Sequence, residues 1–395
     1  MNSLLFLGRQ PNLGIAELES VYGAEHLTFI WDKFVISDLP NNSFDLMRLG
    51  SVLKITEIIE EISLAKIKDL DFTITKIVAK HIKDNDISSK FNLGISSHNS
   101  GMDKNELTKL ALTVKKNLKK EAFSIRIIPN KYEIISTAQV IHNDLTNAMK
   151  GLEIVLVRKK DSLLIVKTTQ EQNIEAYAAR DQARPYRDAY VGMLPPKLAQ
   201  TIINFAVGKK DLKSIEILDP FCGTGVLLQE ALLMGCPVVT GTDLEERMIE
   251  YSRGNIDWLE KKYNASKQSI IIEQGDATSA AWSEFNCVAS ETYLGKPLST
   301  IPRKDFLREL IEPVNLLHKK FLKNIYTQLA SGARICLAVP AWKTENNQFI
   351  HLPVLDQLAE LGYNRIALEK VSSKDLLYFR PDQIVARELV ILTRK

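Results

Sequence analysis

The chain has 395 residues, of which 45% are hydrophobic and 25% are charged, and its formal net charge is +3. This length predicts two or three domains with substantial cores, and the small net charge alone neither establishes nor excludes a nucleic-acid partner. The sequence has no run of about 18 apolar residues, and its first residues lack the pattern of a secretion signal, so we expect a cytoplasmic protein without a membrane partner.

The cysteines and histidines argue against a metal centre. The six histidines show no spacing typical of metal ligands. The cysteines are far apart in the sequence, so we expect neither a disulfide framework nor a zinc site and predict reduced, buried thiols. They are Cys222, Cys236, Cys287 and Cys336.

Residues 1–62 predict a small domain of their own. Their patterns give the order strand, helix, strand, strand, helix, strand, which is typical of a ferredoxin-like domain. That fold hosts many unrelated activities, so it indicates nothing about function. The strands are expected at 3–8, 28–30, 34–36 and 52–59, and the helices at 13–22 and 43–49.

Residues 63–172 predict an α+β domain with one basic surface. The helix expected at 105–120 has apolar residues on one face, at i, i+3 and i+4 spacing, and lysines on the other. This basic face either contacts nucleic-acid phosphates or is simply solvated. Its candidate residues are Lys109, Lys115, Lys116 and Lys119, with Arg126 in the following strand. The other expected elements are helices at 72–82 and 136–143, strands at 91–96 and 124–128, and a hairpin of 151–158 with 163–169.

Residues 173–192 predict a polar connector, followed by a third domain at 193–395. The helix expected at 197–207 begins behind two prolines, which suit a helix start. The connector contains Arg180, Arg184 and Arg187. These arginines either contact RNA phosphates or pair with Asp181 and Asp188.

Residues 215–228 predict a buried strand, a glycine turn and the start of a helix. Gly223 and Gly225 allow a sharp turn and close approach of a ligand, and the helix start favours a negative group. Leu228 stands where the dinucleotide fingerprint requires a third glycine, which argues against hydride chemistry. S-adenosylmethionine suits the corner better, because its carboxylate fits the helix start and its ammonium fits Asp219. The alternative is a glycine turn that binds nothing.

The next two apolar runs also end in acids. Asp243 follows Asp219 at roughly the 20-residue spacing from which an acid reaches ribose hydroxyls, so we predict it as the ribose ligand. Asp276 ends the run at 270–277, where a carboxylate accepts from the adenine amino group. Each acid alone is equally well explained as a helix cap or a solvated loop residue, but three in register favour one binding site.

Three stretches of the sequence carry a family resemblance. Residues 219–225, Asp-Pro-Phe-Cys-Gly-Thr-Gly, resemble motif I of class I S-adenosylmethionine-dependent methyltransferases that act on exocyclic amino groups. Residues 180–200, with 5–11 near the N-terminus, resemble THUMP-containing tRNA guanosine N2-methyltransferases, the group that modifies guanosine 10.

The resemblance implies an α/β protein. Its catalytic domain would be a Rossmann-like class I methyltransferase domain at 193–395, preceded by a ferredoxin-like domain at 1–62 and a THUMP RNA-binding domain at 63–172. It also implies S-adenosylmethionine as cofactor and tRNA as partner, and it allows a small activating subunit. The predicted cofactor-binding residues are Asp219, Phe221, Gly223, Thr224, Gly225, Asp243, Leu244, Asp276 and Ala277. The predicted RNA-binding residues are Lys109, Lys115, Lys116, Lys119, Arg126, Arg184 and Arg187.

The motif expected after the fourth cofactor strand, at 287–289, departs from the family pattern. Such enzymes carry an acid, asparagine or serine, then Pro-Pro and an aromatic residue, whereas this chain has Ser-Glu-Thr-Tyr-Leu-Gly at 290–295. Aligning on the aromatic residue selects Ser290 and Tyr293. Aligning on the acid and Gly295 selects Glu291, with Leu294 in the place of the aromatic residue. We predict Tyr293 as the residue that stacks on a flipped base, with Glu291 or Ser290 accepting the amino hydrogens. Trp342 either joins the stacking or packs against the sheet.

The remaining elements complete a methyltransferase sheet: helices at 313–330 and 354–361, and strands at 333–339, 365–371 and 387–393. The predicted reaction is methyl transfer to N2 of a tRNA guanosine, at position 10 by resemblance. One alternative is methylation of another RNA base, such as an exocyclic amine in ribosomal RNA. The other is an inactive protein that binds RNA and cofactor, because the Pro-Pro pair is missing.

Overall fold

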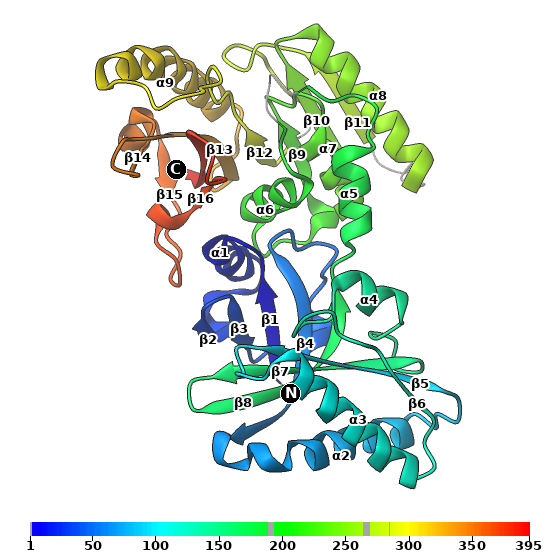
Figure 1. Ribbon diagram of the computed structural model, residues 1–395. Helices are drawn as coiled ribbons and strands as arrows, with labels where there is room; N and C mark the ends of the chain where they lie inside the picture. The colour runs from blue at the N-terminus through cyan, green and yellow to red at the C-terminus, as the bar shows by residue number, and fades with distance from the viewer. Residues whose placement is uncertain (1, 189–192, 264–268, 284) are drawn as a thin grey trace. The chain divides into compact units, whose positions relative to one another are not determined.

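The computed structural model describes residues 2–188, 193–263, 269–283 and 285–395 (Figure 1). The chain forms two compact units. The first comprises Met1–Gly8, His26–Leu46 and Val52–Ala176, and the second comprises Arg9–Glu25, Met47–Ser51 and Tyr177–Lys395. The four residues that end the expected connector, 189–192, lie outside the described residues, and the domain boundaries expected at 62 and 172 stay predictions.

The first unit is built on one eight-stranded sheet in the order β2-β3-β1-β4-β8-β7-β5-β6. Strand β3 is antiparallel to both β1 and β2. Strands β1 and β2 therefore run the same way with β3 between them, which is the split arrangement of a ferredoxin-like fold. The strands are β1 (Ser3–Leu7), β2 (Leu27–Trp31), β3 (Phe34–Ser37), β4 (Val52–Ser63), β5 (Phe91–His98), β6 (Ile125–Ile127), β7 (Gly151–Lys159) and β8 (Ser162–Glu171).

The helix predicted at 43–49 is wrong. Between β3 and β4 the structure has a 3₁₀ turn at Asn41–Ser43 and no α-helix. The backbone N–H of Leu46 donates to Gln170 Oε1 at 3.2 Å, so a side chain takes a donor that a helix would use.

Two long helices of the first unit, α2 (Leu70–Asp84) and α3 (Lys104–Lys120), pack together on one face of this sheet (Figure 1). Asp103 begins α3 with a capping box, in which its carboxylate accepts from two backbone N–H groups and Glu106 bonds back to the Asp103 N–H. The apolar stripe of α3 is buried and its lysines remain on the outer side, as the sequence period predicts. A short helix, α4 (Thr137–His142), has the expected hydroxyl cap at Ser136.

The second unit contains the sheet order β11-β10-β9-β12-β13-β17-β15. The strands from β11 to β13 are parallel, and β17 is antiparallel to both of its neighbours. The strand order reverses between β9 and β12, which makes that edge the topological switch point of a Rossmann-like sheet. The strands are β9 (Glu216–Asp219), β10 (Val238–Asp243), β11 (Ser269–Gln274), β12 (Cys287–Glu291), β13 (Arg334–Lys343), β14 (Phe349–Ile350), β15 (Tyr363–Arg365), β16 (Leu377–Tyr378) and β17 (Val385–Arg394). The helices are α1 (Pro11–Tyr22), α6 (Pro196–Val207), α7 (Val226–Met234), α8 (Glu246–Tyr263) and α9 (Lys304–Tyr326), and α5 (Ile174–Gln182) joins the two units. The predicted α/β class and Rossmann-like domain are confirmed.

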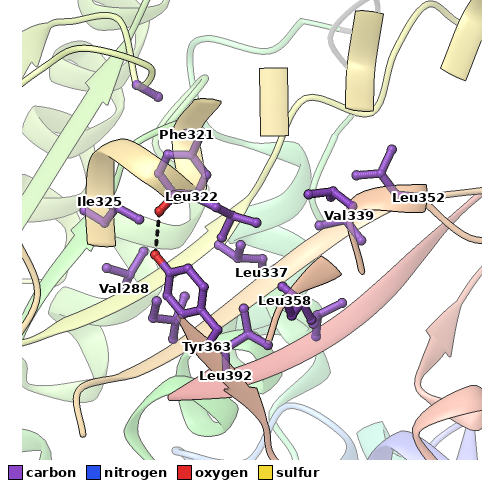
Figure 2. Packing of buried hydrophobic residues seen from close by; sticks show 14 of the residues in the cluster. Val288, Phe321, Leu322, Ile325, Leu337, Val339, Leu352, Leu358, Tyr363 and Leu392 are labelled. Carbon is purple, nitrogen blue, oxygen red and sulfur yellow. Dashed lines mark hydrogen bonds between the residues drawn. The ribbon is translucent and has the colours of Figure 1, made fainter. Parts of the chain in front are cut away.

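Helix α9 forms one side of the main core of this unit. Figure 2 shows Phe321 and Leu322 facing residues of the sheet such as Leu337, and the hydroxyl of Tyr363 donates to the Leu322 carbonyl at 2.6 Å. The helix begins nine residues before the predicted start at 313 and contains Pro313. Burial of one continuous stripe across the proline outweighs its cost of about 3 kcal/mol in a helix. The stripe consists of Leu307, Ile311, Val314, His318, Phe321, Leu322 and Ile325.

Helix α1 belongs to the second unit, although it follows the first strand of the chain. It is buried from Leu13 to Val21, and it contacts α6. The carboxylate of Glu17 accepts from Gly50 N at 3.0 Å, Ser51 N at 2.8 Å and Asn204 Nδ2 at 2.7 Å. Glu17 is fully buried, and burial raises its pKa.

Two further predictions near the C-terminus are wrong. The strand expected at 365–371 ends at Arg365, because the backbone N–H groups of Glu369 and Lys370 donate to the Glu19 carboxylate of α1 at 2.5 and 2.9 Å. The helix expected at 354–361 is a 3₁₀ turn at Pro353–Gln357. None of the helices in the described ranges is long and apolar enough to cross a bilayer.

Candidate active site

A cavity of about 470 Å³ opens at the carboxyl ends of β9, β10, β11 and β12. Ligands of open α/β sheets bind at such a switch point, where strand ends leave a crevice. Its lining brings together segments that are far apart in the sequence. They include residues 219–224, 243–245, 275–278 and 291–297, with Leu194, Met248 and Leu317.

The turn between β9 and α7 depends on its two glycines. Gly223 has φ +52° and Gly225 has φ +77°, which are left-handed values that glycine adopts without strain. A Cβ on Gly225 would also lie 2.8 Å from Ser252 Oγ. Helix α7 begins directly after this turn, and its first residues Val226 and Leu227 line the cavity, so the helix start with its free N–H groups borders the cavity.

Leu228 occupies the position of the missing third glycine without pushing α7 away from the sheet. The space comes from the strand instead, since a Cβ on Gly241 of β10 would lie 2.4 Å from Leu228 Cδ1. Close packing of helix on strand is therefore achieved with the glycine on the other element.

Asp219 lies at the inner end of the cavity and is 2% exposed. It accepts hydrogen bonds from Ser290 Oγ at 2.6 Å and from Phe221 N at 3.2 Å. Burial, with a smaller effect from the Asp243 and Glu291 carboxylates, raises the pKa of Asp219 to about 7, although these hydrogen bonds oppose the rise. A buried carboxylate of this kind gains strongly from a cationic ligand.

The other two predicted acids line the same cavity. Asp243 accepts from Gly223 N at 2.9 Å and Glu245 N at 3.0 Å, and burial raises its pKa. Asp276 is exposed, and hydrogen bonds from the Thr278 N–H and hydroxyl, both at 2.8 Å, lower its pKa. Eight of the nine predicted cofactor residues line the cavity, and the ninth, Gly225, shapes the turn.

The opposite wall comes from the end of β12. Glu291 and Tyr293 line the cavity, and Tyr293 is 45% exposed. Glu291 Oε1 accepts a hydrogen bond from Arg387 Nε of β17. Ser290 is fully buried and bonded to Asp219, so it is not brought into the cavity wall.

Thr292 is fixed from two sides. Burial lowers the pKa of His318 to about 4, so its ring is neutral at pH 7. Its Nδ1 lies 2.7 Å from the Val314 carbonyl and therefore donates to it, which leaves Nε2 to accept from the Thr292 hydroxyl at 2.7 Å. The Thr292 backbone N–H donates to the Ala338 carbonyl at 3.0 Å. Sequence reasoning missed His318 and Arg387, since neither lies near the motif in the chain.

The remaining predicted side chains separate into exposed and buried groups. Trp342 is 2% exposed within the core, so it packs against the sheet. On the first unit Lys109, Lys116, Lys119 and Arg126 are exposed and Lys115 is half-buried.

The expected polar connector contains α5, and its arginines differ from one another. Arg180 is buried and pairs with Glu230 at 2.7 Å, and Asp188 pairs with Arg247 at 2.8 Å. Asp188 thus pairs with an arginine outside the connector, whereas the Asp181 carboxylate attracts the Arg184 guanidinium, as one of the two alternatives predicted. Arg184 is 3% exposed, whereas Arg187 is exposed.

Residues 184–349 match the family model of the RMKL-like methyltransferase domain. The second unit carries a methyltransferase domain of this family. Its match covers the glycine turn, all three acids and the segment from Glu291 to Tyr293, so the cavity lies inside the methyltransferase domain. The predicted S-adenosylmethionine cofactor is confirmed, and the buried acid beside a helix start fits its ammonium and carboxylate.

Two relatives are similar in sequence to part of this chain. It is 34% identical over 163 residues to the tRNA (guanine(10)-N2)-dimethyltransferase of Methanothermobacter thermautotrophicus, which covers 40% of this chain and 43% of the relative. It is 30% identical over 151 residues to the enzyme of the same name from Pyrococcus abyssi, covering 38% and 39%. These relatives confirm the family resemblance of the sequence. The chain spans about two fifths of their length.

The crystal structure of TrmN from Thermus thermophilus is similar over the whole length of both chains. The TM-score is 0.52 at 14% sequence identity, and each chain is covered to 100%. Because the sequence identity is so low, this similarity shows a shared fold only. The shared fold includes the first unit as well as the methyltransferase domain.

Proposed function

We propose that this protein transfers a methyl group from S-adenosylmethionine to the exocyclic N2 of a guanosine in tRNA, at position 10, in the cytoplasm. One observation carries the proposal: Glu291 and Tyr293 share a cavity with the three acids that suit the cofactor. The relatives named for guanine-10 N2 methylation support the choice of substrate.

Each end of the cofactor has residues that suit it. The Asp219 carboxylate would hold the ammonium, and the N-terminus of α7 would hold the carboxylate. Asp243 would accept from the ribose hydroxyls, and Asp276 with Ala277 would meet the adenine ring. The cofactor supplies a methyl group already activated by its sulfonium, so positioning accounts for much of the rate.

The substrate side needs a stacking surface and a hydrogen-bond acceptor. Tyr293, at the cavity wall and exposed, would stack on a guanine turned out of the tRNA. Glu291 Oε2 would accept an N2 hydrogen, which turns the nitrogen lone pair toward the cavity. N2 must lose one proton as its new bond to carbon forms, and this carboxylate can hold it. Ser290 would act through Asp219.

A reaction with purified chain and labelled donor tests the proposal. Unmodified tRNA should acquire N2-methylguanosine at position 10, mapped by mass spectrometry, and a transcript with adenosine at that position should acquire none. Label in ribosomal RNA alone would favour methylation of another base. Cofactor binding with no transfer to any RNA would favour an inactive binding protein, unless a small activating subunit restores transfer.

The first unit would bind the tRNA, with residues 1–62 as a ferredoxin-like domain and 63–172 as a THUMP domain. The outer face of α3 carries the lysines that would contact phosphates, with Arg126 beside them and the exposed Arg187 in the connector. Arg184 is also a predicted RNA-binding residue, but it is buried and is not available to a phosphate. Reversing charge at Lys115 and Lys116 should weaken tRNA binding and reduce its salt dependence by about one unit of slope per lost phosphate contact. The exposed pair Lys209 and Lys210 gives a control with the same change in net charge. If the two double variants weaken tRNA binding equally, the α3 lysines do not contact tRNA phosphates and are simply solvated.

A further inference from the structure

We propose that Arg387 is a positioning residue for methyl transfer, because it holds the Glu291 carboxylate at the cavity wall. This inference rests on the proposed function and adds a residue that lies far from the sequence motif. Glu291 and Arg387 are 96 positions apart in the chain.

The sheet brings the two side chains together across one strand. Glu291, the last residue of β12, lies opposite Ala338 of β13, and Arg387 of β17 lies opposite Pro340 of the same strand. Arg387 thus reaches over β13 to donate from Nε to Glu291 Oε1. The pair is set by the register of three neighbouring strands.

Arg387 and Glu291 differ in how far their side chains are exposed to the cavity. The Arg387 side chain is 6% exposed and does not line the cavity, whereas that of Glu291 is 14% exposed and lines it. Arg387 engages Oε1, so Oε2 is the oxygen presented to a donor from the substrate. A guanidinium is planar and always charged, so it fixes the direction of the carboxylate as well as its charge.

The backbone beside Glu291 is held independently of this pair. Thr292 is bonded to His318 and, through its N–H, to Ala338. Loss of Arg387 should therefore release the Glu291 side chain without moving the strand end. The effect should appear in the rate at saturating substrate and not in cofactor binding.

A second ion pair on the same strand gives a matched control. Arg365 Nη2 lies 2.7 Å from Glu388 Oε1, and Glu388 follows Arg387 directly on β17. Successive side chains of a strand point to opposite faces. Arg365→Gln thus removes an ion pair of β17 whose partners do not line the cavity.

The experiment measures kcat and KM for tRNA, and the dissociation constant of the cofactor by calorimetry. The variants are Arg387→Lys, Arg387→Gln, Glu291→Gln, the double variant Glu291→Gln with Arg387→Gln, and Arg365→Gln. We expect Arg387→Gln to lower kcat by up to about 100-fold, the loss that a displacement of about 1 Å can cause, with cofactor affinity unchanged. Arg387→Lys should recover part of the rate, and the double variant should be no slower than Glu291→Gln, since both changes remove one unit.

Three results would overturn the inference while the proposed function stands: wild-type kcat in Arg387→Gln, an equal loss in Arg365→Gln, or additive losses in the double variant. If Arg387→Gln does not fold, Arg387→Lys replaces it in the single and the double variant, because it keeps the buried charge. Wild-type kcat in Arg387→Lys, or additive losses with Glu291→Gln, would then overturn the inference. A wild-type chain that folds, binds the cofactor and transfers no methyl group to tRNA, with or without an activating subunit, overturns the proposed function and this inference with it.

Discussion

The two walls of the cavity are built in different ways. The cofactor wall consists of strand ends and a glycine turn, and its acids bond mainly to backbone N–H groups close to them, such as Asp243 to Gly223 and Glu245. The substrate wall consists of Glu291, Thr292 and Tyr293, and its side chains are held by Arg387 and His318 from distant elements. Both walls need the folded sheet. Each acid of the cofactor wall can nevertheless be recognised in its own short stretch of sequence, whereas the partners of Glu291 and Thr292 lie far away in the chain.

The largest effect should come from the substrate wall. Glu291→Gln keeps the size of the side chain but removes the charge that accepts the amino hydrogen and its proton. We expect kcat to fall by about 10²- to 10⁴-fold, the usual contribution of a positioned acid or base, while cofactor affinity stays the same. Single-turnover kinetics with calorimetry would measure both. If Glu291→Gln also weakened cofactor binding, the substrate wall and the cofactor wall would not act independently.

The cofactor wall should show the reverse pattern. Asp243→Ala removes an acceptor for the ribose hydroxyls and the bond to Gly223 N. A hydrogen bond to a charged group contributes about 1.5–3 kcal/mol, so the dissociation constant should rise about 10- to 100-fold with a smaller change in kcat at saturation. Asp243→Asn is the control, because its amide oxygen can still accept from Gly223. If calorimetry finds the wild-type affinity for the cofactor in Asp243→Ala, Asp243 does not bind the cofactor.

The pH dependence of cofactor binding should report on Asp219. Its pKa is about 7, and its carboxylate must be ionised to hold an ammonium. Affinity should therefore rise roughly tenfold between pH 6 and pH 8 and then level off. Asp219→Asn should abolish this dependence, and Ser290→Ala should move it to higher pH, because the Ser290 hydrogen bond lowers the Asp219 pKa.

The same group should affect the stability of the unliganded protein in the opposite direction. Burial raises the folded pKa of Asp219 above its unfolded value, so its favourable contribution is complete below the ordinary aspartate pKa. That contribution is lost as the pH rises through about 7. Thermal unfolding of wild type and Asp219→Asn across this range would measure the difference, and identical profiles would contradict the burial of a titrating carboxyl.

The smallest effect on function should come from the packing behind the cofactor wall. Gly241→Ala places a Cβ 2.4 Å from Leu228 Cδ1 and 3.1 Å from Cys222 Cβ. Overpacking of this kind costs about 1–3 kcal/mol of unfolding free energy. At Gly275 an added Cβ meets its nearest atom at 3.5 Å, so Gly275→Ala is the control. Denaturant unfolding would compare them, and equal stabilities would show that α7 can shift freely.

The sequence predicted the cofactor wall because each of its features is short in range. An apolar run ending in an acid places Asp219, Asp243 and Asp276 at one edge of a parallel sheet, and glycines mark the turn. Helices with a clear period were also predictable, α3 above all. Pro313 hid the first turns of α9, since proline is more often found at a helix start.

The failures at 43–49 and 365–371 share one physical cause: side chains from distant parts of the chain replaced local backbone hydrogen bonding. The segment at 43–49 and the segment after Arg365 were expected to be regular, but their backbone N–H groups, or those beside them, donate to Gln170, Glu17 and Glu19. Two of these acceptors, Glu17 and Glu19, lie on α1, far from these segments in the chain. For Arg180 the sequence left RNA contact and pairing with Asp181 or Asp188 open, and the structure pairs it instead with Glu230 in the interior.

The position of α1 has a consequence during protein synthesis. This helix leaves the ribosome early, but its partner α6 and the backbone at 369–370 follow roughly 180 to 350 residues later, which takes tens of seconds at 5–20 residues per second. Until then the side of α1 that packs against α6 is uncovered and is a site for chaperones or for self-association. A gene fragment that starts at residue 177 would encode the second unit with an uncovered α6, because it would still lack Arg9–Glu25 and Met47–Ser51.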